Sequence, residues 1–444
     1  EFGYQLLRAC VMYLFCVRHF NDVDHITPIV WRMKNDNYPV AVYCINPRYD
    51  INNDYRLNYL RKQGVTVESI YDACEHKSNG LHKTMRHLFQ WFYAKGNKLS
   101  SHHDEKPLLL PRLSKLAVQS IARVSYELTR ISFYRKSWAR YFLEESEAQL
   151  LCFDHIFPGR YVVGVLLEAA REKSIPTLAL PHGVYLYTNE SYKAGTSSRQ
   201  RFHKFNRFGY VIVQNQLRKD VLVRSGITRE KIIVLGSARF CDEWIEQNRK
   251  ILPRMIDSNS HSRKLKVVFM VSKPHCRIDI ERMLNTFDLL SNLNEIEVMV
   301  KPHTRTGTNS RLFANLSSSN ASNILTPELC DWADVVLVIG SSVITEALMQ
   351  EKPVLYLKYL HANTMLFEEC GACWTIQTEA ELEQALQSLR NKNTDLPYGD
   401  ENVNRFLSEV VYGGRNKRDV LGLSLIHISE PTRLNSTSRM PSSA

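Results

Sequence analysis

The residues best suited to chemistry follow short apolar segments of strand length. One such segment, 335–339, runs into Gly340, Ser341 and Ser342, and a segment of helical pattern begins at once. The free amides and positive dipole at a helix start suit a phosphate, and serine hydroxyls add donors. Glu346 stands one turn into that helix, where its carboxylate can reach a ribose diol beyond the phosphates. The alternative interpretation makes Ser341 or Ser342 a simple N-cap and Glu346 a surface acid.

A group of potential cations follows an earlier strand-like segment, 296–300. Lys301, His303 and Arg305 come directly after it. Three such groups at the carboxyl end of a strand can neutralise the charge that builds on a diphosphate leaving group, which a protein without a bound metal requires. A solvated basic turn is the alternative.

Two strand-like segments in the first half of the chain deliver a potential base. One ends in Pro-His-Gly at His182, and the other ends at Asp154. An imidazole with a pKa near neutrality suits general-base work on an acceptor hydroxyl, and Gly183 permits a close backbone approach. His182 and Asp154 are therefore the candidates, with a purely structural role at the strand end as the alternative for each.

Two further patterns have the form of metal sites. Asp22 and Asp24 form an Asp-x-Asp between the first strand and a helix, where helix capping is the favoured explanation. Cys370 and Cys373 lack a second cysteine pair and a histidine at zinc-ligand spacing, which favours structural thiols. Walker loops, Gly-x-Gly-x-x-Gly and a convincing nucleophile elbow are absent from the sequence, which weighs against kinases and hydrolases. We expect no metal and no cofactor.

The elements that would position these residues alternate along the chain. Apolar segments of strand length alternate with segments of helical period, which predicts parallel sheets covered by helices. The expected fold class is α/β, with two doubly wound Rossmann-like domains that face a central cleft, because ligands of open α/β sheets bind outside the carboxyl ends of the strands. Strands are predicted at 11–17, 40–45, 65–70, 150–153, 177–180, 211–213, 232–235, 267–271, 296–300, 335–339 and 354–357. Helices are predicted at 24–34, 161–173, 278–293, 342–350 and 379–389.

The expected domains are an acceptor domain at 1–240, a linker at 241–264 and a nucleotide-donor domain at 265–420. The tail 423–444 reads like a translated sequencing adapter and is expected to be non-native. A helical insertion at about 81–147 interleaves basic and aromatic residues with apolar ones at helical spacing. It can lie on an anionic membrane surface or pack on its own domain with a solvated basic face, and both interpretations stay open.

The bulk composition fits a large globular protein, with 44% hydrophobic and 23% charged residues. No apolar run approaches the roughly 18 residues that a membrane span needs. The 10 irregularly spaced cysteines favour reduced thiols, so a cytoplasmic location is predicted, with peripheral attachment at the inner face of the plasma membrane left open. A formal charge of +11 favours anionic partners such as nucleotides, phosphorylated polymers or a membrane face, and no nucleic-acid partner is expected.

Five short motifs, in their order along the chain, resemble GT-B enzymes of bacterial surface polysaccharides. They lie at 180–183, 235–240, 301–303, 340–347 and 352–354. The similar families are CDP-glycerol glycerophosphotransferases and capsule polysaccharide transferases, and the second domain is also similar to UDP-GlcNAc 2-epimerases. The resemblance implies functional roles for His182 and His303, and donor phosphate and ribose binding by Ser341, Ser342 and Glu346.

The expected function is metal-independent transfer of a glycosyl or polyol-phosphate group. The donor would be a nucleotide-activated sugar or CDP-glycerol, and the acceptor a polysaccharide, teichoic-acid-like or lipid-linked molecule. His182 or Asp154 would take the acceptor proton, while His303 with Lys301 or Arg305 would stabilise the departing phosphate. An epimerase and a non-catalytic binding protein on the same fold are the alternatives.

Overall fold

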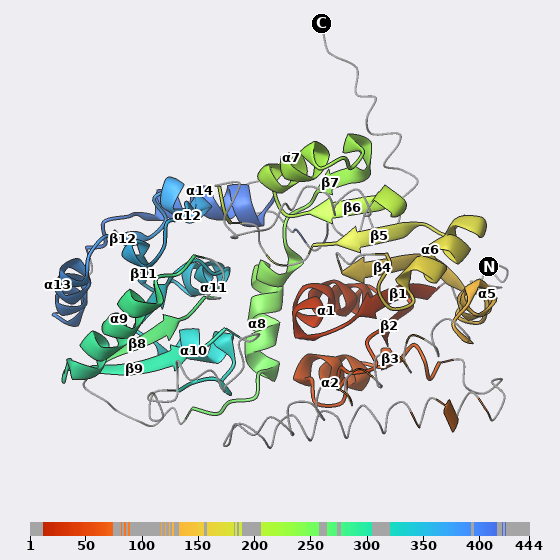
Figure 1. The fold of residues 1–444 in the computed structure, drawn as a ribbon, viewed down its shortest axis with the longest axis horizontal. Coiled ribbons are helices and arrows are strands. Elements are labelled where there is room, and N and C mark those ends of the chain that lie inside the picture. Colours follow the sequence, from red (N-terminus) through yellow and green to blue (C-terminus); the bar gives the residue numbers. More distant parts are fainter. Residues whose placement is uncertain are drawn as a thin grey trace, which may run out of the picture.

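The computed structural model describes most of the chain in two sheet-containing lobes (Figure 1). The described residues are 12–73, 133–154, 158–181, 183, 186–188, 206–256, 264–272, 277–303, 320–391, 395–414 and several single positions. The predicted insertion is described mainly from residue 133 onward, and the tail 423–444 lies outside the described residues.

The first sheet has seven strands in the order β3-β2-β1-β4-β5-β6-β7. All of its pairings are parallel. The strands are β1 (Met12–Val17), β2 (Val40–Cys44), β3 (Thr66–Ser69), β4 (Ala148–Asp154), β5 (Thr177–Leu180), β6 (Tyr210–Val213) and β7 (Ile232–Val234). Central strands such as β2 and β5 are buried along their whole length, as expected of parallel strands with helices on both faces.

The second sheet has five strands in the order β12-β11-β10-β8-β9, again all parallel. The strands are β8 (Leu265–Met270), β9 (Ile296–Lys301), β10 (Val335–Val338), β11 (Val354–Leu357) and β12 (Trp374–Ile376). Both sheets are therefore doubly wound, which confirms the predicted fold class.

Amphipathic helices cover these sheets. In α9, the buried residues Met283, Phe287 and Leu290 recur at helical spacing and pack in the core of the second sheet. In the first lobe and the connection the helices are α1 (Phe20–Asn35), α2 (Tyr55–Lys62), α5 (Lys136–Glu145), α6 (Val163–Glu172), α7 (Gln216–Arg224) and α8 (Asp242–Ile251). In the second they are α9 (Ile280–Asn292), α10 (Thr326–Trp332), α11 (Val343–Met349), α12 (Leu366–Glu369), α13 (Glu379–Arg390) and α14 (Asp400–Phe406), which continues as the π-helical turn η9 (Leu407–Val411).

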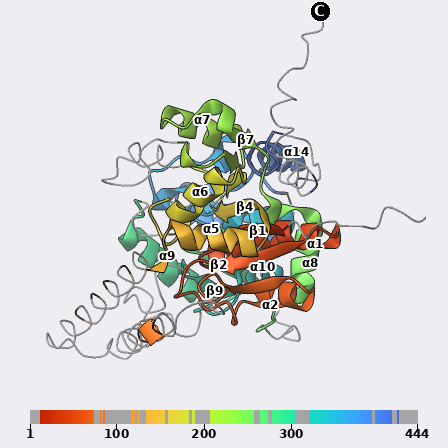
Figure 2. The same cartoon turned by 90° about the vertical axis from the view of Figure 1, so that its right-hand side faces the viewer.

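The two lobes are connected twice. Helix α8 stands between the sheets (Figure 1), and in the view turned by 90° the first lobe lies in front of the second (Figure 2). After η9 the chain returns to the first lobe, where the backbone amide of Ser237 donates to the carbonyl of Val411 at 2.8 Å. The end of the second lobe thus packs against the first lobe.

The predicted strands all overlap observed strands, whereas several element limits differ. Helix α1 begins at Phe20, four residues before the predicted start. Asp22 therefore lies inside its first turn. Strand β12 was not predicted, since three residues carry too little periodic pattern to stand out.

Candidate functional site

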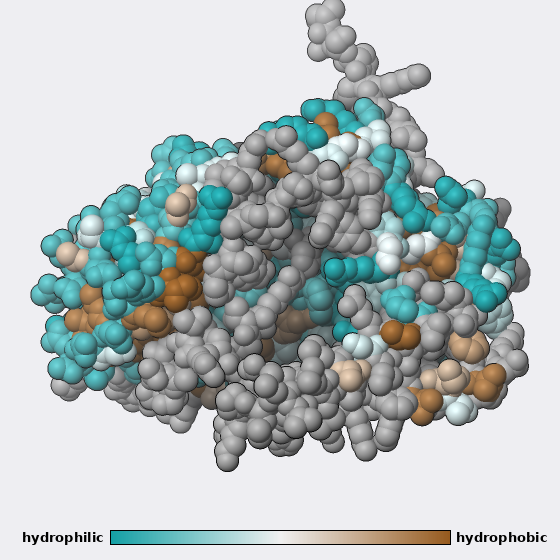
Figure 3. Space-filling view, in the orientation of Figure 1, coloured by the Kyte–Doolittle hydropathy of each residue, from teal (hydrophilic) through white to brown (hydrophobic). Residues whose placement is uncertain are grey.

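The order of each sheet reverses at one point, and ligands of open α/β sheets bind beside such points. In the first sheet the reversal lies between β1 and β4, which end next to Arg18 and at Asp154. In the second it lies between β8 and β10, the latter leading to Gly340. Figure 3 shows a hollow between the lobes, with hydrophilic residues visible on its first-lobe edge.

A buried charge cluster occupies the first reversal point. The Arg18 guanidinium bonds the Asp22 carboxylate at 2.7 and 3.0 Å and also pairs with Asp154. His19 Nδ1 lies 3.0 Å from the same Asp22 carboxylate. Burial, and then the like charge of Asp154, raises the pKa of Asp22 to about 6 against the opposing effect of Arg18.

This cluster bears on two interpretations of the sequence. Asp154 is only 1% exposed and pairs with Arg18, so in this conformation it holds a cation and does not face the solvent as a base would. Neither Asp22 nor Asp24 is the N-cap residue of α1, which is His19 and makes no side-chain cap. The Asp22 carboxylate accepts from the backbone amide of Arg18 at 2.8 Å, just before the helix. Asp22 binds Arg18, and Asp24 pairs with Arg56 and with Arg239 at 3.2 Å.

The loop after β5 is fixed from two sides. Its Gly183 has a φ of +70°, which an L side chain rarely adopts. The Gly183 amide donates to Nε2 of buried His25 at 2.9 Å, and Gln214 donates to the Gly183 carbonyl. His182 lies outside the described residues, but its neighbour is anchored by two side chains from other elements.

The same loop reaches the second lobe through residues 186–188, which we call the strap. Backbone hydrogen bonds join Thr188 to the Thr364 carbonyl at 3.0 Å and Leu366 to the Leu186 carbonyl at 2.8 Å. The hydroxyls of Thr188 and Thr364 lie 2.7 Å apart. Tyr187 stands between Leu186 and Thr188 in the chain, and its hydroxyl donates to the carbonyl of Gly340 at 3.1 Å.

The serine pair begins α11 at the second reversal point. The Ser341 hydroxyl accepts from the Val343 amide at 3.3 Å, whereas Ser342 is the N-cap residue without a side-chain cap. Ser342 is half-buried, and its hydroxyl has no hydrogen-bond partner among the described residues. Ser341 therefore serves the helix start, and Ser342 keeps a hydroxyl available for another group.

Buried His361 lies behind this turn. Its Cε1 is 3.7 Å from the position that a Cβ on Gly340 would take. Its Nδ1 accepts from the Asn363 amide at 3.1 Å, while burial, followed by the charge of Lys358, lowers its pKa to about 4. A neutral imidazole therefore supports the Gly340 turn.

Glu346 does not face open solvent. It is 5% exposed, its carboxylate lies 3.9 Å from Arg239, and Gln350 donates to it at 3.3 Å. Burial raises its pKa, an effect that Arg239 opposes. The cavity that Glu346 shares with Asp24 and Arg239 measures about 40 Å³, which holds only a few water molecules, since one water needs roughly 10–15 Å³ of such space. A ribose would enter here only after Arg239 moves.

The predicted cations separate. The Lys301 ammonium donates to three backbone carbonyls, of Ala321 at 3.3 Å, Ser322 at 2.7 Å and Ile324 at 2.5 Å, while burial lowers its pKa to about 8. Its donors are thus used inside the second lobe. Half-buried His303 lies two residues after the end of β9. This strand is two strands from β10, so His303 stands roughly 10 Å across the sheet from the serine turn. Arg305 lies outside the described residues.

Three residues of this region were missed from the sequence: His25, Tyr187 and His361. His25 and His361 left no local signal, because each acts through a partner far away in the chain. Tyr187 stands five residues after His182, and an aromatic residue in the same strand-end loop was a usable clue.

The remaining sequence features concern cysteines, metal binding and membrane spans. Cys370 and Cys373 are buried free thiols. Within the described ranges, no group of three or more histidine, cysteine or acidic side chains could hold a metal ion. None of the described helices is long and apolar enough to cross a membrane.

No protein-family model and no curated protein matches the sequence. Solved structures match in fold. A putative UDP-N-acetylglucosamine 2-epimerase from Listeria monocytogenes gives a TM-score of 0.56 at 10% identity, over 95% of this chain and 97% of that one. The structure of S. aureus MnaA with UDP gives a TM-score of 0.52 at 13% identity, over 98% of this chain and 100% of that one. The UDP-GlcNAc 2-epimerase of Methanocaldococcus jannaschii gives a TM-score of 0.50 at 13% identity, over 88% of this chain and 96% of that one. The fold is GT-B-like, as predicted.

Proposed function

We propose that this protein transfers a glycosyl or polyol-phosphate group from a nucleotide-activated donor to a hydroxyl of a surface-polymer acceptor. The observation that carries the proposal is the contact between Tyr187 and Gly340, because it joins the loop of the candidate base to the turn of the candidate donor site. The residue types of the two loops suit complementary halves of one reaction.

In the proposed reaction, the turn at Ser342 binds the donor phosphates and Glu346 binds the ribose once Arg239 has moved. His182 takes the proton of the acceptor hydroxyl, whose oxygen bonds to the anomeric carbon of a sugar donor. The bond from that carbon to the diphosphate oxygen breaks, and the nucleoside diphosphate leaves from the turn at Ser342. With CDP-glycerol, the acceptor oxygen would instead bond to the distal phosphorus and CMP would leave.

The acid cluster at the first reversal point takes a supporting role in this proposal. Arg18 holds Asp154 and Asp22 together beneath the cleft, which fixes the ends of β1 and β4. We therefore favour His182 over Asp154 as the base.

A thermal-shift screen with UDP-, CDP-, GDP- and CMP-linked donors tests donor binding, because a ligand of the native state raises its apparent stability. With the best donor, calorimetry of Ser342→Ala should give an affinity at least tenfold weaker, while Ser146→Ala, a serine at the end of α5, should match the parent. His182→Ala should lower turnover and leave donor affinity within twofold. Unchanged donor affinity in Ser342→Ala would refute the donor site.

A second assay separates transfer from epimerisation. The protein is incubated with the donor sugar nucleotide and no acceptor, and the sugar is analysed by NMR. A transferase returns the donor unchanged, whereas an epimerase produces the second epimer. Conversion of the sugar in this assay would overturn the transferase proposal.

A further inference from the structure

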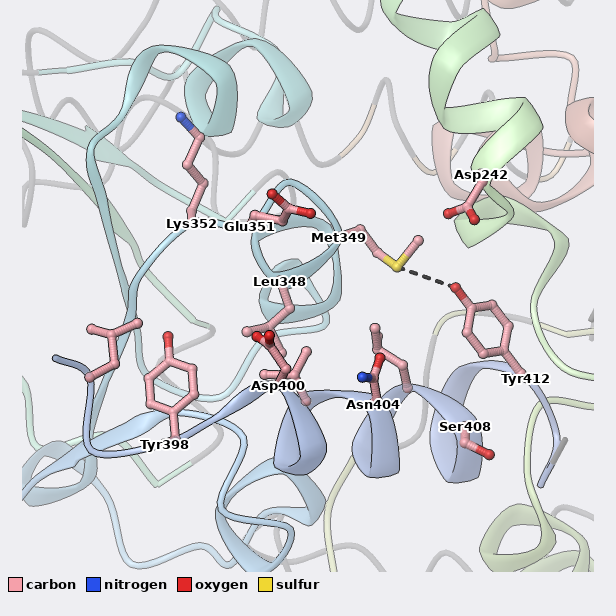
Figure 4. A pocket seen from close by; sticks show the side chains of 13 residues that line it. Asp242, Leu348, Met349, Glu351, Lys352, Tyr398, Asp400, Asn404, Ser408 and Tyr412 are labelled. Atoms are coloured by element: carbon pink, nitrogen blue, oxygen red, sulfur yellow. Dashed lines mark hydrogen bonds between the residues drawn. The ribbon is translucent and has the colours of Figure 1, made fainter. Parts of the chain in front are cut away.

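A second cavity lies away from the cleft, at the end of α11 opposite to Ser342 (Figure 4). Its volume is about 730 Å³, within the range of roughly 300–1,000 Å³ that small-molecule sites occupy. Three segments form its walls: the start of α8, the end of α11 with the following turn, and the helix α14 with η9. None of its lining residues belongs to the donor turn or to the strap.

The cavity combines an apolar floor with a polar rim. Leu348, Met349, Leu396, Val403 and Leu407 supply the apolar surface. Such a surface receives hydrocarbon groups of a ligand in preference to water.

A nearly buried phenol points at this space. Tyr412 is 5% exposed, and its hydroxyl donates to the thioether sulfur of Met349 at 3.4 Å (Figure 4). Sulfur of this kind is a weak acceptor, and the two lone pairs of the phenol oxygen remain able to accept from a ligand. A buried hydroxyl normally finds a stronger partner, so the cavity contains a polar group suited to a donor that enters from outside.

The charges of the rim are mainly negative. Asp242, Glu351 and Asp400 come from three different segments, and Glu351 and Asp400 form no side-chain ion pair with any described residue. The one lysine, Lys352, is engaged with the backbone carbonyls of Asp331 at 3.2 Å and Ala333 at 2.8 Å. This acidic rim stands in a chain whose formal charge is +11, so it selects against the anions that the rest of the surface attracts.

We propose that this cavity binds a small aliphatic polyamine, with ammonium groups at the carboxylates of Asp242, Glu351 and Asp400 and the alkyl segments on the apolar floor. The origin of the carboxylates favours this class: they come from three separate segments, and the described residues offer no group of three or more histidine, cysteine or acidic side chains that could hold a metal ion. A flexible chain with two or more ammonium groups satisfies several carboxylates at once, and the Tyr412 oxygen accepts one further ammonium hydrogen. This site does not depend on the proposed transfer reaction.

Calorimetry of the full chain with spermidine tests the proposal, and 1,8-octanediol serves as the uncharged ligand of similar length. Spermidine should bind with a Kd between micromolar and millimolar, and the diol should give no measurable heat. The neutral variant Glu351→Gln/Asp400→Asn should bind spermidine at least tenfold more weakly. Tyr412→Phe should weaken binding about threefold to tenfold, as expected for one lost hydrogen bond.

A matched variant removes the same charge elsewhere in the second lobe: Asp288→Asn/Glu383→Gln, on the exposed surfaces of α9 and α13. It should retain the parent affinity. Hydrogen exchange over 400–411 should slow with spermidine in the parent and in the matched variant, but not in the rim variant. Absence of binding, equal binding of the diol, or equal weakening in the matched variant would each overturn the proposal.

Discussion

The hydroxyl of Tyr187 lies 3.1 Å from the carbonyl oxygen of Gly340, across 153 positions of the sequence. Tyr187 belongs to the loop that follows β5, and Gly340 to the turn that follows β10. Backbone pairing of Leu186 and Thr188 with the segment 364–366 holds the tyrosine in place. The first lobe thus contacts the turn that would hold the donor, and the strap sets the separation of the two loops.

Removing this hydroxyl should impair the turn without unfolding the protein. One neutral hydrogen bond contributes about 0.5–1.5 kcal/mol, so Tyr187→Phe should weaken the best nucleotide donor about twofold to tenfold in calorimetry. Tyr38→Phe, which alters a half-buried tyrosine packed edge-on to Tyr13, is the control and should bind as the parent does. Equal affinity of Tyr187→Phe and parent would mean that the contact with Gly340 is irrelevant to the donor.

A substitution of Lys301 can show whether this residue stabilises the fold or the leaving group of the proposed reaction. Its ammonium satisfies the carbonyls of Ala321, Ser322 and Ile324, so Lys301→Met should leave buried acceptors unpaired. We expect urea unfolding to register a loss of roughly 1–3 kcal/mol. Lys250→Met, at an exposed ion pair of α8, should cost less than about 1 kcal/mol. Weaker donor binding by folded Lys301→Met, with unchanged stability, would restore the leaving-group role expected from the sequence.

The sequence predicted the layers better than the site. Buried parallel strands are continuous apolar runs, so β10 and β11 stand out locally, and the residues at their ends follow directly. The direction of a side chain at a strand end depends on distant partners. Lys301 turns toward carbonyls 20 or more positions later, and Glu346 toward Arg239, relations that no local pattern encodes.

The same reason explains the residues that were missed. His25 is a buried helix residue in an otherwise ordinary amphipathic pattern, and its role appears only when Gly183 is brought beside it. Strand order also cannot be obtained from alternation alone. The placement of β8 between β9 and β10, which separates His303 from Ser342, required the three-dimensional structure.

The buried Asp22 predicts a particular dependence of stability on pH. Its folded-state pKa of about 6 exceeds the ordinary value of 3.8, so between these values the folded state binds more protons than the unfolded state. The contribution is therefore fully present below about pH 4 and is lost as the pH rises through 6. Relative to Asp22→Asn, the parent should lose roughly 2 kcal/mol of unfolding free energy from pH 4 to pH 7. Urea titrations at several pH values measure this difference.

Asp36→Asn is the control for that experiment, because Asp36 pairs with Arg32 at the exposed end of the same helix. Its stability difference from the parent should change little over the same pH range. A flat difference for Asp22→Asn would show that Arg18 compensates the burial of the carboxylate.

Gly236 connects the segment 235–240 to the returning end of the chain. Its φ is +88°, and a Cβ there would lie 2.6 Å from the Val411 carbonyl oxygen, which already accepts from the Ser237 amide at 2.8 Å. Gly236→Ala should therefore cost roughly 2–4 kcal/mol in urea unfolding, because backbone must shift on both sides. Gly399→Ala is the matched control, since its Cβ would meet no atom within 4 Å and its φ is −112°. We expect the motif at 235–240 to serve mainly in docking η9, so folded Gly236→Ala should keep the parent's donor affinity. Lost donor affinity with unchanged stability would instead assign the motif to the donor site.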